Sequence, residues 1–142
     1  MPSFTLQMAN LQASGPVVDL AVAVDEVLEK YLKTQNQPVP PPIIIPAMID
    51  TGATGTVINP AIPKQLNLKP VGVTFINTPS STNVKCYQYP VRILFPHNVV
   101  AETIAIAAPL QGQHIQCLIG RDILRHGVLI YLGYANQFTL SF

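Results

Sequence analysis

Hydrophobic and polar residues alternate along much of the chain, which predicts short strands rather than long helices. The alternation is clear over residues 4–12 and 16–24, on the two sides of the small-residue turn at residues 13–16. Two such runs with a turn between them are typical of a β-hairpin. We therefore expect a first hairpin from Phe4 to Val24.

Residues 25–35 have helical periodicity instead. Asp25 can cap the first turn, and two lysines follow two glutamates at i+4 spacing, which stabilises a helix. The apolar face is formed by Val27, Leu28, Tyr31 and Leu32. This stretch predicts one short amphipathic helix. The proline-rich residues 36–42 then predict an extended connector, and the apolar residues 43–49 predict a strand.

The rest of the chain is again typical of strands and turns. Residues 71–77 and 84–95 predict two strands joined by a polar turn at 78–83, and residues 99–107 predict a third strand. Residues 117–120 predict a short buried strand, and residues 121–126 predict one or two helical turns that end at Gly127. Residues 128–142 predict a terminal hairpin, so the expected fold class is mainly β.

Composition limits the class of protein further. The 142 residues fit one domain, and 49% are hydrophobic but only 11% charged, which predicts a large core or a buried interface. A formal net charge of +1 without a basic stripe argues against nucleic acid as a partner. No apolar run approaches the roughly 20 residues of a membrane helix, and the first residues lack a signal-peptide pattern. We expect a cytoplasmic protein without membrane contact.

The cysteines and histidines show no spacing that is typical of metal ligands. Cys86 and Cys117 are expected to be reduced core residues, with a disulfide between them as the alternative. His97, His114 and His126 are expected in loops or on the surface. The sequence therefore predicts neither a bound metal nor a cofactor.

Asp50, Thr51 and Gly52 follow the predicted strand at residues 43–49. Asp50 can supply a carboxylate for acid–base chemistry, Thr51 can hydrogen-bond to a neighbouring copy of the loop, and Gly52 leaves its N–H free to face the acid. An aspartate at a strand end is more often a simple turn former. The tripeptide by itself leaves a turn and a catalytic loop both open.

A second segment favours the catalytic loop. Residues 118–124 (LIGRDIL) place two apolar residues before Gly120 and a short helix after it. Together with residues 48–58 (MIDTGATGTVI), this segment resembles the retropepsin-like aspartic proteases, in which an apolar-apolar-Gly segment crosses beneath the active-site loop. The resemblance runs from Ile43 to Phe142, is looser over residues 5–24, and is greater to bacterial-type single-domain members than to retroviral ones.

The resemblance implies a fold and an assembly. Residues 1–142 are expected to form a single retropepsin-like aspartic protease domain, a mainly β, closed β-barrel with one or two short helices that is active as a two-fold dimer. Residues 25–42, the helix and proline-rich segment, are an insert relative to retroviral members and are expected to pack against the barrel. The last strand, with Phe138, Leu140 and Phe142 on one face, is expected to be an unpaired edge that joins its symmetry mate.

The implied activity needs two carboxylates, because one acts as a base toward water while the other, protonated, polarises the scissile carbonyl. The chain has one Asp-Thr-Gly loop, so the second Asp50 is expected from a second copy across a two-fold axis. The resemblance thus implies a homodimeric aspartic endopeptidase that acts on polypeptides, with catalytic residues Asp50, Thr51 and Gly52. The alternative is a non-catalytic dimer of the same fold that binds peptides or partner proteins.

Other roles follow from the same resemblance. The polar turn at residues 77–83 would be the tip of a flap that closes over substrate. Substrate-binding residues would be Ala53, Val57, Ile76 and Leu118, although ordinary core packing explains the last three equally well. Structural support would come from Gly120, Arg121 and Asp122. In retroviral members the arginine pairs with acids, but this chain has Thr54 and Gly55 at those positions. Retroviral flaps are also rich in glycine, whereas this chain has no glycine between Gly72 and Gly112.

Overall fold

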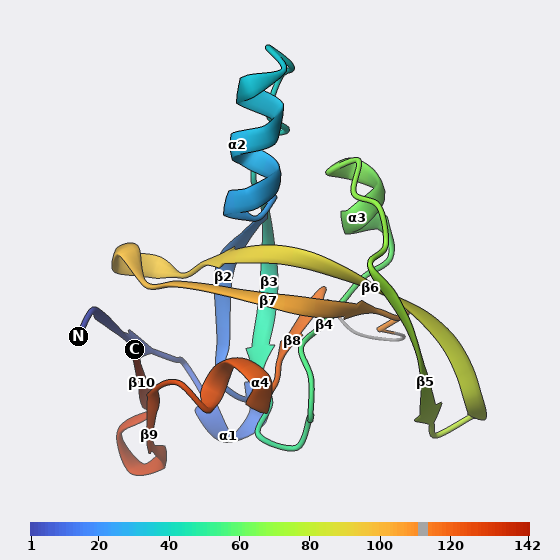
Figure 1. Ribbon diagram of the computed structural model, residues 1–142. Helices are drawn as coiled ribbons and strands as arrows, with labels where there is room; N and C mark the ends of the chain where they lie inside the picture. The colour runs from blue at the N-terminus through green and yellow to red at the C-terminus, as the bar shows by residue number, and fades with distance from the viewer. Residues whose placement is uncertain (111–113) are drawn as a thin grey trace.

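The computed structural model of the chain describes residues 1–110 and 114–142 and is mainly β, as the sequence predicts (Figure 1). The strands in these residues are β1 (Ser3–Gln7), β2 (Val17–Ala23), β3 (Ile43–Ile49), β4 (Val57–Ile58), β5 (Gly72–Thr78), β6 (Ser81–Leu94), β7 (Val100–Ala107), β8 (Cys117–Ile119), β9 (Val128–Leu132) and β10 (Gln137–Ser141). The helices are α1 (Leu11–Ser14), α2 (Glu26–Thr34), α3 (Ala61–Gln65) and α4 (Arg121–Leu124), with two 3-10 turns, η1 (Pro96–Asn98) and η2 (Gly133–Ala135).

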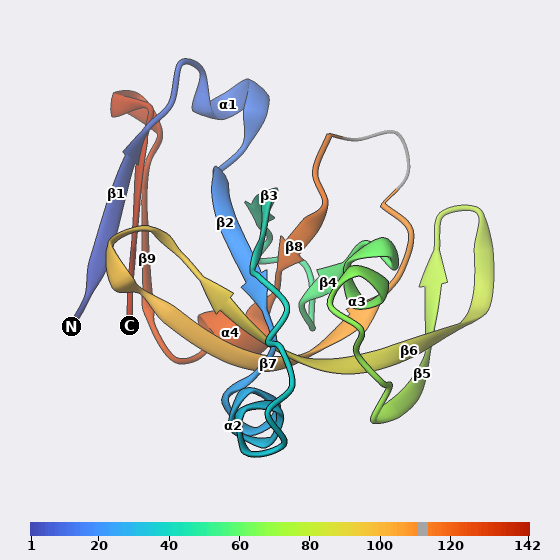
Figure 2. The ribbon, with the colours of Figure 1, turned by 90° about the horizontal axis from the view of Figure 1, so that it is seen from above.

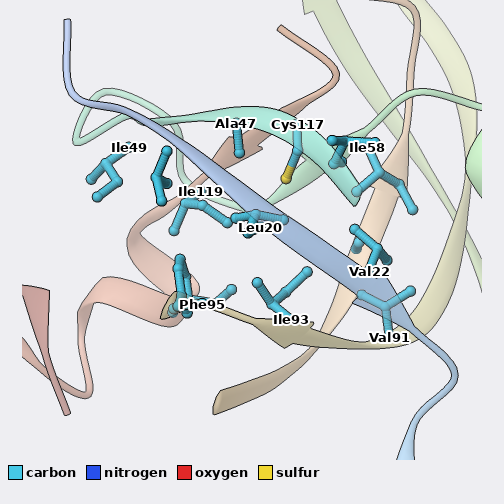
Figure 3. Close-up of a cluster of buried hydrophobic side chains, with 14 of the residues drawn as sticks. Leu20, Val22, Ala47, Ile49, Ile58, Val91, Ile93, Phe95, Cys117 and Ile119 are labelled. Atoms are coloured by element: carbon cyan, nitrogen blue, oxygen red, sulfur yellow. The ribbon is translucent and has the colours of Figure 1, made fainter. Parts of the chain in front are cut away.

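Six strands form a ring of hydrogen-bonded neighbours. Their order is β2, β3, β8, β4, β7 and β6, and β6 pairs back to β2, while β5 extends the sheet beyond β6. Buried side chains from several strands meet inside the ring, among them Val22, Ile93 and Ile119 (Figure 3). Because side chains alternate between the two faces of a strand, the apolar alternation in the sequence supplies this core.

Helix α2 is the predicted amphipathic helix. Asp25 caps it, since one of its carboxylate oxygens accepts a hydrogen bond from the Leu28 N–H at 2.9 Å. The predicted i+4 pairs are both present, each with an N–O distance of 2.9 Å: Lys30 with Glu26 and Lys33 with Glu29. None of the residues of α2, all of which the structure describes, is buried. The helix therefore lies on the outside of the ring, at the top in Figure 1.

Charged groups attach α2 to the ring. The Arg92 guanidinium on β6 lies 3.0 Å from Glu29 of α2 and 3.3 Å from Glu102 of β7. Glu102 also accepts a hydrogen bond of 2.8 Å from the backbone N–H of Glu26 in the first turn of α2. The insert at residues 25–42 thus contacts the ring through a network of three charged side chains.

The predicted hairpin from Phe4 to Val24 is wrong. β1 pairs with β10 and β2 pairs with β3, so the two runs have different partners. A helical turn, α1, separates them: the Asn10 side chain accepts from the Ala13 N–H at 3.1 Å, and Leu11 is fully buried. Periodicity identifies a strand but not its neighbour, and the Asn10 cap starts a helix where a turn was expected.

The expectation of an unpaired last strand is also wrong. β10 is the middle strand of a three-stranded sheet with the order β1, β10, β9 (Figure 2). Phe138 and Leu140 lie on one face, as predicted, but both are fully buried within the single chain. The rings of Phe138 and Phe4 pack edge to face with centroids 6.3 Å apart. The edges of this sheet are therefore β1 and β9.

The other predicted elements are present. The hairpin of β5 and β6, strand β7, the short strand β8, helix α4 and the hairpin of β9 and β10 lie where the sequence places them. Four α-helices occur in the described residues rather than one or two, because the short helices α1 and α3 were not expected. No helix of the described part of the chain is long and apolar enough to cross a membrane.

Candidate active site

Asp50 stands directly after β3. Its backbone N–H donates to the Ile119 carbonyl of β8 at 2.9 Å, which fixes the start of the loop. The Gly52 N–H donates to a carboxylate oxygen of Asp50 at 2.9 Å, as the sequence predicts. A Cβ at position 52 would lie 3.1 Å from that oxygen, so glycine allows the close approach.

Gly120 brings a second backbone against this loop. A Cβ at position 120 would lie 2.5 Å from the carbonyl carbon of Gly55, closer than real Cβ contacts. The Arg121 N–H donates to the Ala53 carbonyl at 2.9 Å, and the Asp122 N–H donates to the Thr54 carbonyl at 3.2 Å. The predicted crossing of the two segments is therefore present in the structure.

The Asp122 side chain connects α4 to the residue before β4 and to β7. One carboxylate oxygen accepts from the Thr56 hydroxyl at 2.8 Å, and the other accepts from the Thr103 hydroxyl of β7 at 2.6 Å. Thr56 is fully buried, and its hydroxyl oxygen also accepts from the Gly120 N–H at 3.1 Å. The sequence analysis missed Thr56 and Thr103, because each reads locally as an ordinary β-branched strand residue.

Arg121 contacts the loop through a carbonyl and a hydroxyl group rather than through an acid. One guanidinium nitrogen donates to the Thr51 carbonyl at 2.6 Å, and another approaches the Thr54 hydroxyl at 3.3 Å. Arg121 therefore clamps the loop from Thr51 to Thr54 without a carboxylate. The side chain of Thr51 is exposed, as a contact with a neighbouring copy would require.

A pocket of about 600 Å³ opens beside Asp50. Residues of β3, β8, the segment after β7 and the β5–β6 hairpin line it. The described residues that line it are Met48, Asp50, Thr78, Pro79, Ser80, Ser81, Val84, Pro109, Leu110 and Leu118. Among them, Asp50 supplies the one carboxylate. The turn at residues 78–81 and Asp50 therefore line the same pocket.

The predicted substrate-binding residues divide into two groups. Leu118 lines the pocket, whereas Ala53, Val57 and Ile76 are not among the described lining residues. Val57 pairs with Leu118 in the ring, and Ile76 pairs with Val84, so each lies beside a lining residue. Pro109 and Leu110 were not expected, because only the folded chain brings them to the Asp50 loop, and Met48, two residues before Asp50, was not named as a substrate-binding residue.

Asparagine takes the place of glycine in the hairpin turn. Asn83 has a left-handed backbone, φ 52°, which asparagine tolerates better than most residues. Its N–H donates to the Asn77 side chain at 3.1 Å, and the Ser81 N–H donates to the Thr78 hydroxyl at 3.1 Å. Polar side chains therefore close this turn without glycine.

The two cysteines lie in the core. Cys86 and Cys117 are both buried and free, as predicted. Burial, and next the nearby Asp122 carboxylate, raise the pKa of the Cys117 thiol to about 12. Within the part of the chain that the structure describes, no group of three or more His, Cys, Asp or Glu side chains could hold a metal ion.

No protein-family model matches this chain, and no curated protein matches it. An assignment of function therefore depends on the residues and geometry described above.

Proposed function

We propose that the protein is a homodimeric aspartic endopeptidase of the retropepsin type, with one Asp50 carboxylate from each copy. The observation that carries this proposal is the position of Asp50: its carboxylate accepts from the Gly52 N–H and lies in a pocket lined by apolar side chains and by hydroxyl groups from the turn of the β5–β6 hairpin. Peptide hydrolysis by an activated water needs a carboxylate at a cleft that can admit a polypeptide.

One carboxylate is not enough for this chemistry. At a two-fold axis the two Asp50 side chains would lie within a few Å and would share one proton, because like charges at that distance do not both ionise easily. The ionised carboxylate takes a proton from water, which attacks the scissile carbonyl, and the protonated carboxylate donates to the carbonyl oxygen. The tetrahedral diol then collapses as the amide nitrogen leaves with a proton. No covalent bond forms between the enzyme and the substrate.

The pocket walls favour a class of substrate. Met48, Val84, Leu110 and Leu118 present apolar surface around Asp50, whereas Thr78, Ser80 and Ser81 present hydroxyls from the hairpin. Apolar side chains on either side of the scissile bond gain from burial against the first group. The second group can hydrogen-bond the peptide backbone. We therefore expect extended polypeptides with apolar residues at the cut.

The test is the Asp50→Asn variant in a cleavage assay with a mixed peptide library at several pH values. Asparagine keeps the shape but removes the base and the shared proton, so cleavage should fall by about 10²–10⁴-fold. Asp19→Asn, which changes an exposed acid on β2, is the matched control and should keep full activity. Undiminished proteolysis by pure Asp50→Asn protein would rule out this mechanism.

The same assay separates the two candidate functions. Wild-type protein that binds library peptides and cleaves none would favour the non-catalytic alternative, for which the apolar pocket alone would suffice. Inhibition of cleavage by a pepstatin-type compound would support the aspartic mechanism.

A further inference from the structure

β9 is an exposed edge strand of unusual composition. In the described part of the chain it pairs with β10 and with no other strand. Its five residues, Val128 to Leu132, are all apolar or aromatic. Natural edge strands normally carry charges, prolines or bulges that prevent pairing with other chains. β9 has none of these protections.

The whole three-stranded sheet lacks charge. Strands β1, β9 and β10, which the structure describes completely, contain no Asp, Glu, Lys or Arg. β1 is the other edge, but there the exposed side chains are the polar Ser3, Thr5 and Gln7. The apolar edge of this sheet is therefore β9.

Large side chains of β9 and of the turn after it are exposed. Val128 is 49% exposed, Ile130 47%, Tyr131 50% and Tyr134 90%. Ile130 and Tyr131 are adjacent in a strand and so point to opposite faces, which leaves apolar surface on both sides of the free backbone edge. Tyrosine is enriched in protein interfaces, where its ring supplies large contact area and its hydroxyl a hydrogen bond.

β9 is also firmly connected to the Asp50 loop. It follows α4, whose first residue, Arg121, donates to the Thr51 carbonyl. Gly127, directly before β9, packs so closely on the Ser141 carbonyl and the Phe142 ring that it has no room for a side chain. The direction of β9 relative to the Asp50 loop is therefore fixed within each copy.

We propose that two copies of the chain pair antiparallel along β9, so that their three-stranded sheets join into one six-stranded sheet. An antiparallel pair of identical strands has a two-fold axis by construction. The proposed function, on which this inference rests, requires a two-fold axis between the Asp50 loops. One axis satisfies both requirements, and it places the interface on β9 rather than on the internal strand β10.

The first experiment introduces a charge at this interface. In Ile130→Lys, each copy brings a lysine to the same axis, so the dissociation constant measured by sedimentation should rise at least about tenfold. Two variants serve as controls and should stay dimeric: Val27→Lys on the exposed face of α2, and Thr5→Lys on the β1 edge. Circular dichroism shows whether each variant is folded.

A cross-link keeps the proposal testable if Ile130→Lys does not fold. Cysteine replaces each of the five residues Val128 to Leu132 one at a time, because only the residue at the two-fold axis faces its own mate, and each protein is oxidised with copper phenanthroline. Because Cys86 and Cys117 are buried, a disulfide-linked dimer should form through the new thiol in at least one of the five variants. Val27→Cys should form none. Failure of all five variants, or a wild-type protein that is monomeric at every concentration, would overturn the proposal.

The outcomes also distinguish this inference from the proposed function. A β9-dependent dimer that cleaves no peptide would retain the interface and reject the protease. An active, Asp50-dependent protease whose dimer survives Ile130→Lys would retain the function and reject β9 as the interface. Dissociation by Thr5→Lys instead of Ile130→Lys would assign the interface to β1 and reject the proposal.

Discussion

At the scale of single residues, the site depends on positions where only one side chain fits. Gly52 and Gly120 let two backbone segments approach each other, and Asp122 receives hydroxyl groups from both Thr56 and Thr103. The sequence predicted the glycines, because the Asp-Thr-Gly and Leu-Ile-Gly patterns are local. It did not predict the threonines, because their partner is far away in the chain and their role arises only in the fold.

Gly120→Ala should destabilise the protein. The added methyl group would lie 2.5–2.6 Å from the Gly55 carbonyl group, so the crossing of the two segments must open, at a cost of about 1–3 kcal/mol. Urea denaturation measures the loss. Gly133→Ala is the matched control, because its Cβ would meet the Tyr131 ring at 3.4 Å and should be tolerated. Equal stabilities of the two variants would contradict the close packing at Gly120.

Cys117 should resist alkylation in the native state. With the thiol pKa raised to about 12, first by burial and then by the Asp122 carboxylate, only about one thiol in 10⁴ is ionised at pH 8. Iodoacetamide labelling followed by mass spectrometry should modify Cys117 rapidly in urea and very slowly in buffer. Equal rates in the two solvents would show that β8 is not packed as described.

At the scale of elements, local sequence signals were sufficient to predict single helices and strands. They were not sufficient to predict which strands pair. Strand β3, helix α2 and the β9–β10 hairpin were predicted because periodicity and caps lie within a few residues. The partner of β1 and the internal place of β10 were not, since pairing is decided by contacts across the whole chain. The same limit applies to the pocket: Asp50 was predicted from its motif, whereas Pro109 and Leu110, far from Asp50 in the chain, line the pocket because the fold brings them there.

The attachment of α2 should depend on pH. The Lys33 ammonium, and next the Arg92 guanidinium, hold the pKa of Glu29 below its ordinary value of 4.5. A lowered pKa means that the contribution to stability is present above pH 4.5 and is lost as the pH falls below it. Wild-type protein should therefore have a higher urea midpoint than Glu29→Gln at pH 7, and this advantage should shrink as the pH falls below 4.5. An advantage of the same size at pH 7 and pH 3 would show that Glu29 acts through packing.

At the scale of the whole molecule, the proposed enzyme is complete only as a pair. Wild-type and Asp50→Asn chains that exchange freely should form mixed dimers with one carboxylate. If both are needed, activity at fixed total protein should follow the square of the wild-type fraction, or about a quarter in an equal mixture. A linear decrease to about half would show that each copy works alone. Asp19→Asn chains, mixed in the same way, should leave activity unchanged.

The pairing of β1 with β10 has a consequence for how the chain is made. Ser3 lies opposite Ser141, so the first strand has its hydrogen-bonding partner near the other end of the sequence. On the ribosome, β1 must wait until β10 has left the exit tunnel, and Phe4 stays exposed until Phe138 reaches it. Native structure can therefore spread through the ring of strands during translation, but this sheet closes only after synthesis of β10 is finished.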